Sequence, residues 1–220
     1  MDAVPLAGAG SDRRAIHDSK EVLTNDIEIR KILRAHLVAA FREDPETLIL
    51  EELGLRHGAP RVDMVVVNGF LHGFEVKSDR DTLKRLPRQA RMYSEILDYV
   101  TLVVGQRHAA KAESTIPDWW GIQVANHDQD GKVRLQEVRR PLENPAPDKL
   151  AIAKLLWRDE AINFLEEIGA AGGFRSKPRR FVYSRLAEVA EIDTIRAYVR
   201  ERLKSRKDWR SDEQRKLCGD

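Results

Sequence analysis

Two apolar runs separated by an Asn-Gly pair constrain the fold of this chain more than any other feature of its 220 residues. The first run spans 61–68 and contains three consecutive valines, and the second spans 70–77. Asn68-Gly69 is typical of a type I′ turn, because both central residues of that turn need a positive φ. We therefore expect a β-hairpin with buried strands at this point.

Helix and strand patterns surround the hairpin. Apolar residues at helical spacing predict a helix over 26–42, capped by Thr24 or Asn25, and another from Pro87 to about Leu97. Extended segments are expected over 47–53, 100–104, 121–125 and 132–138, the last two joined by a turn at Asp130-Gly131. Helices between buried strands indicate an α/β fold, with a mixed central sheet flanked by helices.

The composition is that of a folded, soluble chain. Apolar residues make up 42% and charged residues 34%, and the formal net charge is +2. No apolar run approaches the roughly 20 residues that a bilayer span needs, so we expect no membrane association. The single cysteine, Cys218, can form no internal disulfide, and a reducing cytoplasm is the expected location.

A Pro-rich segment divides the chain. The basic excess lies after it, where residues 149–220 hold 17 Lys and Arg against 12 Asp and Glu. We predict a flexible tail over 1–23 (not a signal peptide), an α/β domain over 24–140, a linker over 141–148 and a basic helical region over 149–220. Within that last region, helices are expected over 149–169, 181–191 and 193–204.

The hairpin also carries charged residues that suit phosphodiester hydrolysis. Asp63 lies early on the first strand, while Glu75 and Lys77 share one face of the second, and the turn brings Asp63 close to Glu75. Carboxylate oxygens suit Mg²⁺, which needs one or two carboxylates besides phosphate oxygens. Such an ion polarises the phosphoryl group and acidifies a bound water, and Lys77 would orient that water. Asp63 and Glu75 are the predicted metal ligands.

This pattern resembles a known family. Asp63, eleven intervening residues and Glu75-Val76-Lys77 resemble the PD-(D/E)XK signature of restriction-endonuclease-like phosphodiesterases. Gln89 and Tyr93, one helical turn apart, resemble the Gln-x-x-x-Tyr motif of the RecB-like branches. Val62 stands where the signature has a proline that is often absent. The resemblance covers 52–105 and is to a poorly characterised bacterial and phage branch.

The resemblance implies a fold, an activity and further site residues. It implies an α-β-β-β-α-β core and a nuclease that uses Mg²⁺, for which Mn²⁺ can substitute, with DNA as the expected substrate. Glu52, or less favourably Glu51, would be a third acid of the metal and catalytic site, and Val76 would add its carbonyl oxygen. Gln89 and Tyr93 would organise the site or bind nucleic acid.

Other residues have two interpretations. Arg85 and Arg88 either bind phosphates, as Lys and Arg do in most nucleic-acid interfaces, or lie on a solvated helix face; the same holds for Arg80, Lys84 and Arg91. Asp79 and Asp81 either touch the site or belong to a turn begun by Ser78. Trp119 and Trp120 are expected in the core rather than stacked on a base.

Three functional hypotheses stay open on the residues alone. The first is the metal-dependent nuclease, and the second is a non-catalytic DNA-binding or assembly protein that retains the fold. The third is a toxin or defence nuclease that needs a protein partner. A homodimer would suit cleavage of both strands. The basic helices over 149–220 are either a DNA-binding module or a bundle with solvated charges, and the histidines lack the spacing of metal ligands.

Overall fold

Six strands form one mixed sheet in the computed structural model, which describes residues 23–55 and 61–206. Neighbouring strands in the sheet follow chain order, with β1–β2–β3 antiparallel, β3–β4–β5 parallel and β5–β6 antiparallel. The strands are β1 (Leu48–Gly54), β2 (Arg61–Val67), β3 (Leu71–Lys77), β4 (Tyr99–Gly105), β5 (Gly121–His127) and β6 (Val133–Arg139). The predicted α/β class, with a mixed sheet flanked by helices, is confirmed.

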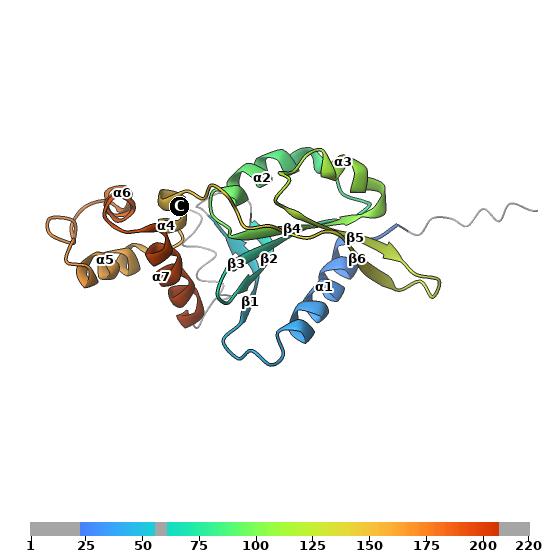
Figure 1. Ribbon diagram of the computed structural model, residues 1–220, viewed down its shortest axis with the longest axis horizontal. Coiled ribbons are helices and arrows are strands. Elements are labelled where there is room, and N and C mark those ends of the chain that lie inside the picture. Colours follow the sequence, from blue (N-terminus) through green and yellow to red (C-terminus); the bar gives the residue numbers. More distant parts are fainter. Residues whose placement is uncertain (1–22, 56–60, 207–220) are drawn as a thin grey trace, which may run out of the picture.

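Helices cover both faces of the sheet and one of its ends. In Figure 1, α1 lies under one face, α2 and α3 cover the other, and α4 to α7 gather beside the sheet. The helices are α1 (Asp26–Ala40), α2 (Leu86–Ser94), α3 (Ala109–Glu113), α4 (Lys149–Ala153), α5 (Arg158–Glu167), α6 (Arg179–Val189) and α7 (Ile192–Ser205). Short 3₁₀ turns, Leu83–Arg85 and Gln106–His108, lead into α2 and α3. The order α1-β1-β2-β3-α2-β4 is the α-β-β-β-α-β core that the resemblance implies.

The hairpin strands are buried on both faces because each face packs against helices. On one side, Ile29, Leu33 and Leu37 of α1 pack in a cluster that includes Val66 and Phe74. On the other side, α2, α3 and the C-terminal helices share one apolar cluster with the sheet. Continuous apolar runs are the pattern that strands buried on both faces require.

The segment between β6 and α4 is bound to the α/β layers by specific hydrogen bonds. The buried Asn144 side chain donates to the carbonyls of Ser94 (2.7 Å) and Leu97 (2.8 Å), and its N–H donates to the carbonyl of Asp98. Arg196 of α7 places its Nε 3.0 Å from the buried Asp98 carboxylate. These bonds hold the Pro-rich segment 141–148, called the strap below, against the sheet domain.

The hairpin is confirmed, but the predicted type I′ turn is wrong. Neither Asn68 nor Gly69 has a positive φ. Instead, the Asn68 side chain accepts the N–H of Phe70 at 3.0 Å, and strand pairing begins at Val67 and Leu71. An asparagine that bonds to the backbone two residues later makes its own turn without a left-handed backbone. Gly131, in the second predicted turn, does have a positive φ of 74°.

The helical segment 149–169 and the end of α2 also differ from prediction. The segment 149–169 is two helices, because Trp157 is extended (φ −68°, ψ 157°) and its N–H donates to the Glu160 carboxylate at 2.7 Å. That bond starts a new helix at Arg158. Helix α2 ends at Ser94 and not near Leu97.

No helix within the described ranges is long and apolar enough to cross a bilayer. The predicted tail, except Leu23, and Cys218 lie outside the described residues.

Candidate acidic site at the end of the hairpin

The site forms where strands β2 and β3 separate. Their register pairs Val67 with Leu71 and continues to Met64 and Phe74. One residue further along β2, the Asp63 side chain reaches across and accepts the N–H of Val76 at 2.7 Å. A carboxylate thus takes a backbone donor of the neighbouring strand, which holds Asp63 beside the Glu75 to Lys77 segment.

Glu75 is fully buried and is bound by three side-chain donors. Lys77 Nζ and Gln89 Nε2 donate to Glu75 Oε1, the latter at 2.5 Å, and Tyr93 donates its hydroxyl to Oε2 at 2.6 Å. Burying an ionised carboxylate is unfavourable unless it is paired and hydrogen-bonded. The donors of α2 and β3 therefore explain how a charge can lie at the centre of the sheet.

Helix α2 supplies this support because Gln89 and Tyr93 lie on its buried face. They are one turn apart, as the sequence predicts, and their side chains are 3.4 Å apart at Nε2 and the hydroxyl. Trp120 stacks on Tyr93 with an interplanar angle of 7° and fixes the ring from behind. Burial and the nearby Glu75 raise the pKa of Tyr93, so its hydroxyl stays a proton donor. Trp120 lies in the core, as expected.

Asp63 is the solvent-facing member of the acidic pair, with 13% of its side chain exposed. Burial and the charge of Glu75 raise its pKa to about 6, against the opposing influence of the Val76 N–H, Arg30 and Lys77. Arg30 Nη2, from α1, lies 2.5 Å from Asp63 Oδ1. The predicted approach of Asp63 and Glu75 is therefore present, and each charge raises the energy of the other.

Lys77 lies on the same face as Glu75, as the strand period requires. Its ammonium contacts Glu75 and donates to the Val76 carbonyl at 3.2 Å, and only 4% of the residue is exposed. A buried lysine needs an opposite charge, and Glu75 provides it. The carboxylates of Asp63 and Glu75 are thus each paired with a cation, Arg30 and Lys77 respectively.

Arg30 is the member of this site that the sequence interpretation missed. Its only local signal is Asp26 one turn earlier, whose carboxylate accepts its Nε at 2.7 Å. The contact with Asp63 spans 33 residues and arises because α1 crosses the hairpin. Nothing in the periodicity of α1 separates Arg30 from the other basic residues of that helix.

The structure does not bring Glu52 into the site. Its carboxylate is about half exposed and pairs with Arg61 Nη1 at 3.1 Å, and its backbone has a positive φ of 55°. Glu51 pairs with Arg34 on α1 at 2.9 Å. Over the described ranges, no three His, Cys, Asp or Glu side chains gather in the manner of a metal site.

The predicted basic residues in α2 and in the segment that leads into it are exposed. Arg85 and Arg88 are exposed, as are Arg80, Lys84 and Arg91, while Gln89 and Tyr93 point inward. Ser78 and Asp81 form the expected turn, since the Asp81 carboxylate accepts the Ser78 N–H at 2.8 Å. The exposed side of α2 and of the segment before it is therefore basic, and it follows the acidic site of β3 in the chain.

The donor set at the site suits a hard divalent cation. Asp63, Glu75 and the Val76 carbonyl offer oxygen ligands, which Mg²⁺ prefers. Among the residues that the structure describes, the buried Gln89 Oε1 has no hydrogen-bond partner, although its Nε2 donates to Glu75. A buried acceptor without a donor is unfavourable, and a cation or a cation-bound water would satisfy it. The residues present therefore fit Mg²⁺ with two carboxylates.

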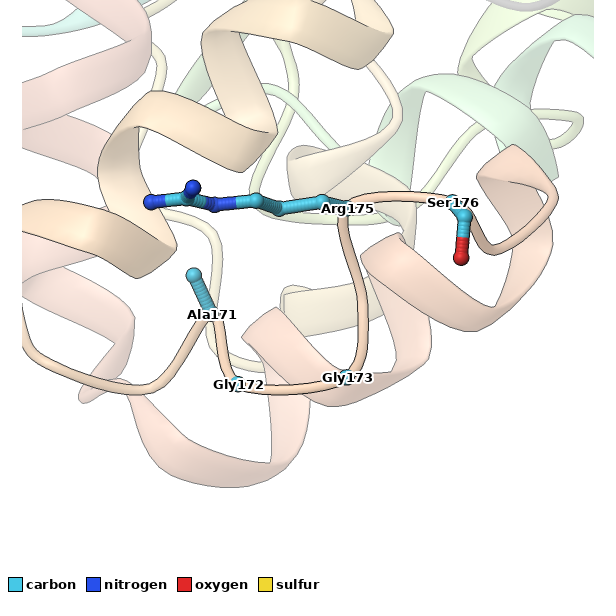
Figure 2. A pocket seen from close by; sticks show the side chains of 5 residues that line it. All are labelled: Ala171, Gly172, Gly173, Arg175 and Ser176. Carbon is cyan, nitrogen blue, oxygen red and sulfur yellow. The ribbon is translucent and has the colours of Figure 1, made fainter.

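A hollow elsewhere on the surface lacks such chemistry. Figure 2 shows it at the loop between α5 and α6, lined by Ala171, Gly172, Gly173, Arg175 and Ser176. Arg175 Nε pairs with Glu166 of α5 at 2.8 Å, so its charge is already neutralised. The acidic site at the hairpin is the stronger candidate for function.

Comparisons with known proteins give one family. A family model described as bacteriophage P4 protein cII matches residues 16–216. Protein cII of Enterobacteria phage P4 is 24% identical over 161 residues, which are 73% of this chain and 60% of that protein, so the chain spans less than two thirds of the relative's length. A solved structure of a protein of unknown function from Silicibacter pomeroyi is 20% identical, with 69% of this chain and 92% of that chain covered and a TM-score of 0.36.

Proposed function

The chain belongs to the family of bacteriophage P4 protein cII, and from the acidic site that it builds we propose that it is a divalent-cation-dependent nuclease. The reaction would be hydrolysis of phosphodiester bonds, with DNA as the substrate by resemblance to the PD-(D/E)XK nucleases. The observation that carries the proposal is the buried Glu75, held by Lys77, Gln89 and Tyr93 beside Asp63.

Burial argues that these charges have a purpose beyond solubility. Glu75 is fully buried and Lys77 nearly so, and an apolar pair of similar volume would pack there without desolvating two charges. Strongly perturbed titratable groups that are clustered in this way favour a functional site. The pKa of Asp63, raised to about 6, is such a perturbation.

The contacts of each side chain support a role in this reaction. Asp63 and Glu75, with the Val76 carbonyl, would hold Mg²⁺ or Mn²⁺, and the bound ion would acidify a water and polarise the phosphate. Lys77 would orient the attacking water, because its ammonium already lies between Glu75 and the Val76 carbonyl. Gln89 and Tyr93 would keep Glu75 in place, and Arg85, in the 3₁₀ turn, and Arg88, on α2, would contact phosphates.

Cleavage by the purified full chain tests the proposal. Plasmid, linear duplex, single-stranded DNA and RNA are incubated with Mg²⁺, with Mn²⁺ and with EDTA. We expect cutting with either ion and none with EDTA, and a loss of about 100-fold or more in Asp63→Asn, the scale at which removal of one catalytic group is felt. The matched control is Glu137→Gln, which alters an exposed carboxylate on β6 that pairs with Arg140. This variant should cut like the wild type.

One observation favours the second candidate, a non-catalytic nucleic-acid-binding or assembly protein. All four carboxylate oxygens of Asp63 and Glu75 already accept hydrogen bonds from protein groups. Carboxylates whose oxygens are all hydrogen-bonded within the protein also suit a chain that keeps these residues to stabilise its fold and has no catalytic activity. Binding of DNA by the wild type without cutting under every cation condition would favour this candidate and contradict the nuclease.

A further inference from the structure

The Arg30 side chain joins two carboxylates at the mouth of the acidic site. Its Nη2 lies 2.5 Å from Asp63 Oδ1, and its Nε lies 2.7 Å from Asp26 Oδ2. About a quarter of the side chain is exposed, compared with 13% for Asp63. Arg30 therefore closes the solvent side of a site whose other donors come from the protein interior.

Among the four carboxylate oxygens of Asp63 and Glu75, Asp63 Oδ1 is bound by the partly exposed side chain of Arg30. The second oxygen, Oδ2, is bound to the Val76 N–H, and both oxygens of Glu75 are held by buried donors. A divalent cation at Oδ1 would lie within a few ångströms of the Arg30 guanidinium. Like charges at that distance repel by several times the thermal energy in a partly buried setting, so the two cannot share the oxygen.

We propose that Arg30 is an exchangeable counter-ion, which neutralises Asp63 until a divalent cation displaces it and then pairs with a phosphate oxygen of the substrate. This inference rests on the proposed nuclease function and adds a substrate-binding residue to it. The planar guanidinium suits a phosphate, because its N–H groups match two oxygens at once. Asp26 keeps the side chain anchored to α1 during the exchange, so the released guanidinium stays at the mouth of the site.

Cation binding tests the exchange without relying on cleavage. Binding of Mn²⁺ to the full chain is followed by the loss of the electron paramagnetic resonance signal of free Mn²⁺. We expect Arg30→Gln to bind Mn²⁺ about 5- to 10-fold more tightly than the wild type, since the pair it removes is partly exposed and of modest strength. Arg30→Lys, which keeps the charge, should change the affinity less.

A matched control lies on the same helix. Arg34, one turn later, pairs with Glu51 at 2.9 Å, and Arg34→Gln should leave Mn²⁺ affinity at the wild-type value. Melting temperatures of the variants verify that each is folded. An Arg30→Gln affinity equal to or weaker than that of the wild type would overturn the exchange. Mn²⁺ binding that appears only in Arg30→Gln would also overturn it, because Arg30 would then be a fixed counter-ion that the cation does not displace, whereas loss of binding in Arg30→Gln/Asp63→Asn verifies that the cation binds at Asp63.

The phosphate contact has a separate readout. At saturating Mg²⁺, where the competition no longer matters, Arg30→Gln should raise KM for duplex DNA by about 10-fold with little change in kcat, as loss of a binding contact requires. An unchanged KM would overturn this half of the proposal. If neither the wild type nor Arg30→Gln binds Mn²⁺, the proposed nuclease function fails as well, whereas Mn²⁺ binding with equal affinities refutes the role of Arg30 alone.

Discussion

Asp63 should make the stability of the protein fall as pH rises through the weakly acidic range. Burial and the nearby Glu75 raise its pKa from 3.8 to about 6. A raised pKa means that the folded state binds this proton more tightly than the unfolded state does. The stabilisation is therefore fully present below about pH 4 and is lost as pH rises to about 6.

The size of the effect follows from the pKa shift. A shift of about two pKa units corresponds to about 3 kcal/mol of unfolding free energy, at 1.36 kcal/mol for each unit. Asp63 is mostly buried, so solvent screening reduces this value little. The pKa of buried Asp98 is also raised, chiefly by burial, and adds a fall of the same sign in both wild type and variant.

Urea unfolding in EDTA, followed by the fluorescence of the four tryptophans, measures this dependence between pH 4 and pH 7. The comparison is with Asp63→Asn, which cannot titrate but keeps the shape of the side chain. The difference in unfolding free energy between the two proteins should change by about 2.4 kcal/mol over this range, most of the full effect, in favour of the variant at high pH. If the two pH curves run parallel, the argument that Glu75 and burial oppose the charge of Asp63 is refuted.

Three further substitutions test the hydrogen bond to Glu75, the close packing at Gly105 and the hydrogen bonds of the strap. Tyr93→Phe removes the hydroxyl bonded to buried Glu75 and should lower the unfolding free energy by about 1.5–3 kcal/mol in urea titrations, the value of a hydrogen bond to a charge. Gly105→Ala would place a methyl group 2.6 Å from the backbone nitrogen of Asp79, and calorimetry should show a lower Tm, with a loss of about 1–3 kcal/mol. Asn144→Ala leaves two carbonyls without their donor, and a loss of about 2 kcal/mol is expected in the same assay, with no loss contradicting the role of the strap.

The parts of the fold that depend on local patterns could be predicted. Continuous valines in β2 require burial on both faces, and the period of the hairpin strands places Glu75 and Lys77 on one face. The turn type could not be predicted, because Asn68 satisfies the Phe70 N–H with its own side chain. The turn made by the Asn68 side chain is an alternative to the type I′ turn, with its positive φ angles, that Asn-Gly usually indicates.

The parts of the site that depend on packing between elements could not be predicted. Strand periodicity assumes a regular backbone, and the positive φ of Glu52 breaks that assumption where the third acid was expected. Arg30 contacts Asp63 only because α1 lies across β2 and β3. An amphipathic pattern shows which face of a helix is buried, but it does not show which residues that helix contacts. Sequence reasoning therefore located the pair of acids and missed the cation that balances it.

This balance of charge links cation binding to phosphate binding. Asp63 and Glu75 supply two negative charges and the partly exposed Asp26 a third, and Arg30 and Lys77 supply two positive ones. A divalent cation would leave a surplus of positive charge in a largely buried site, where unbalanced charge is strongly unfavourable. Release of Arg30 toward solvent removes part of that surplus, and a phosphodiester, with its negative charge, removes more. Cation affinity should therefore rise when a nucleic acid is bound, and equal Mn²⁺ affinity with and without a short DNA duplex would show that the charges of the site are not coupled in this way.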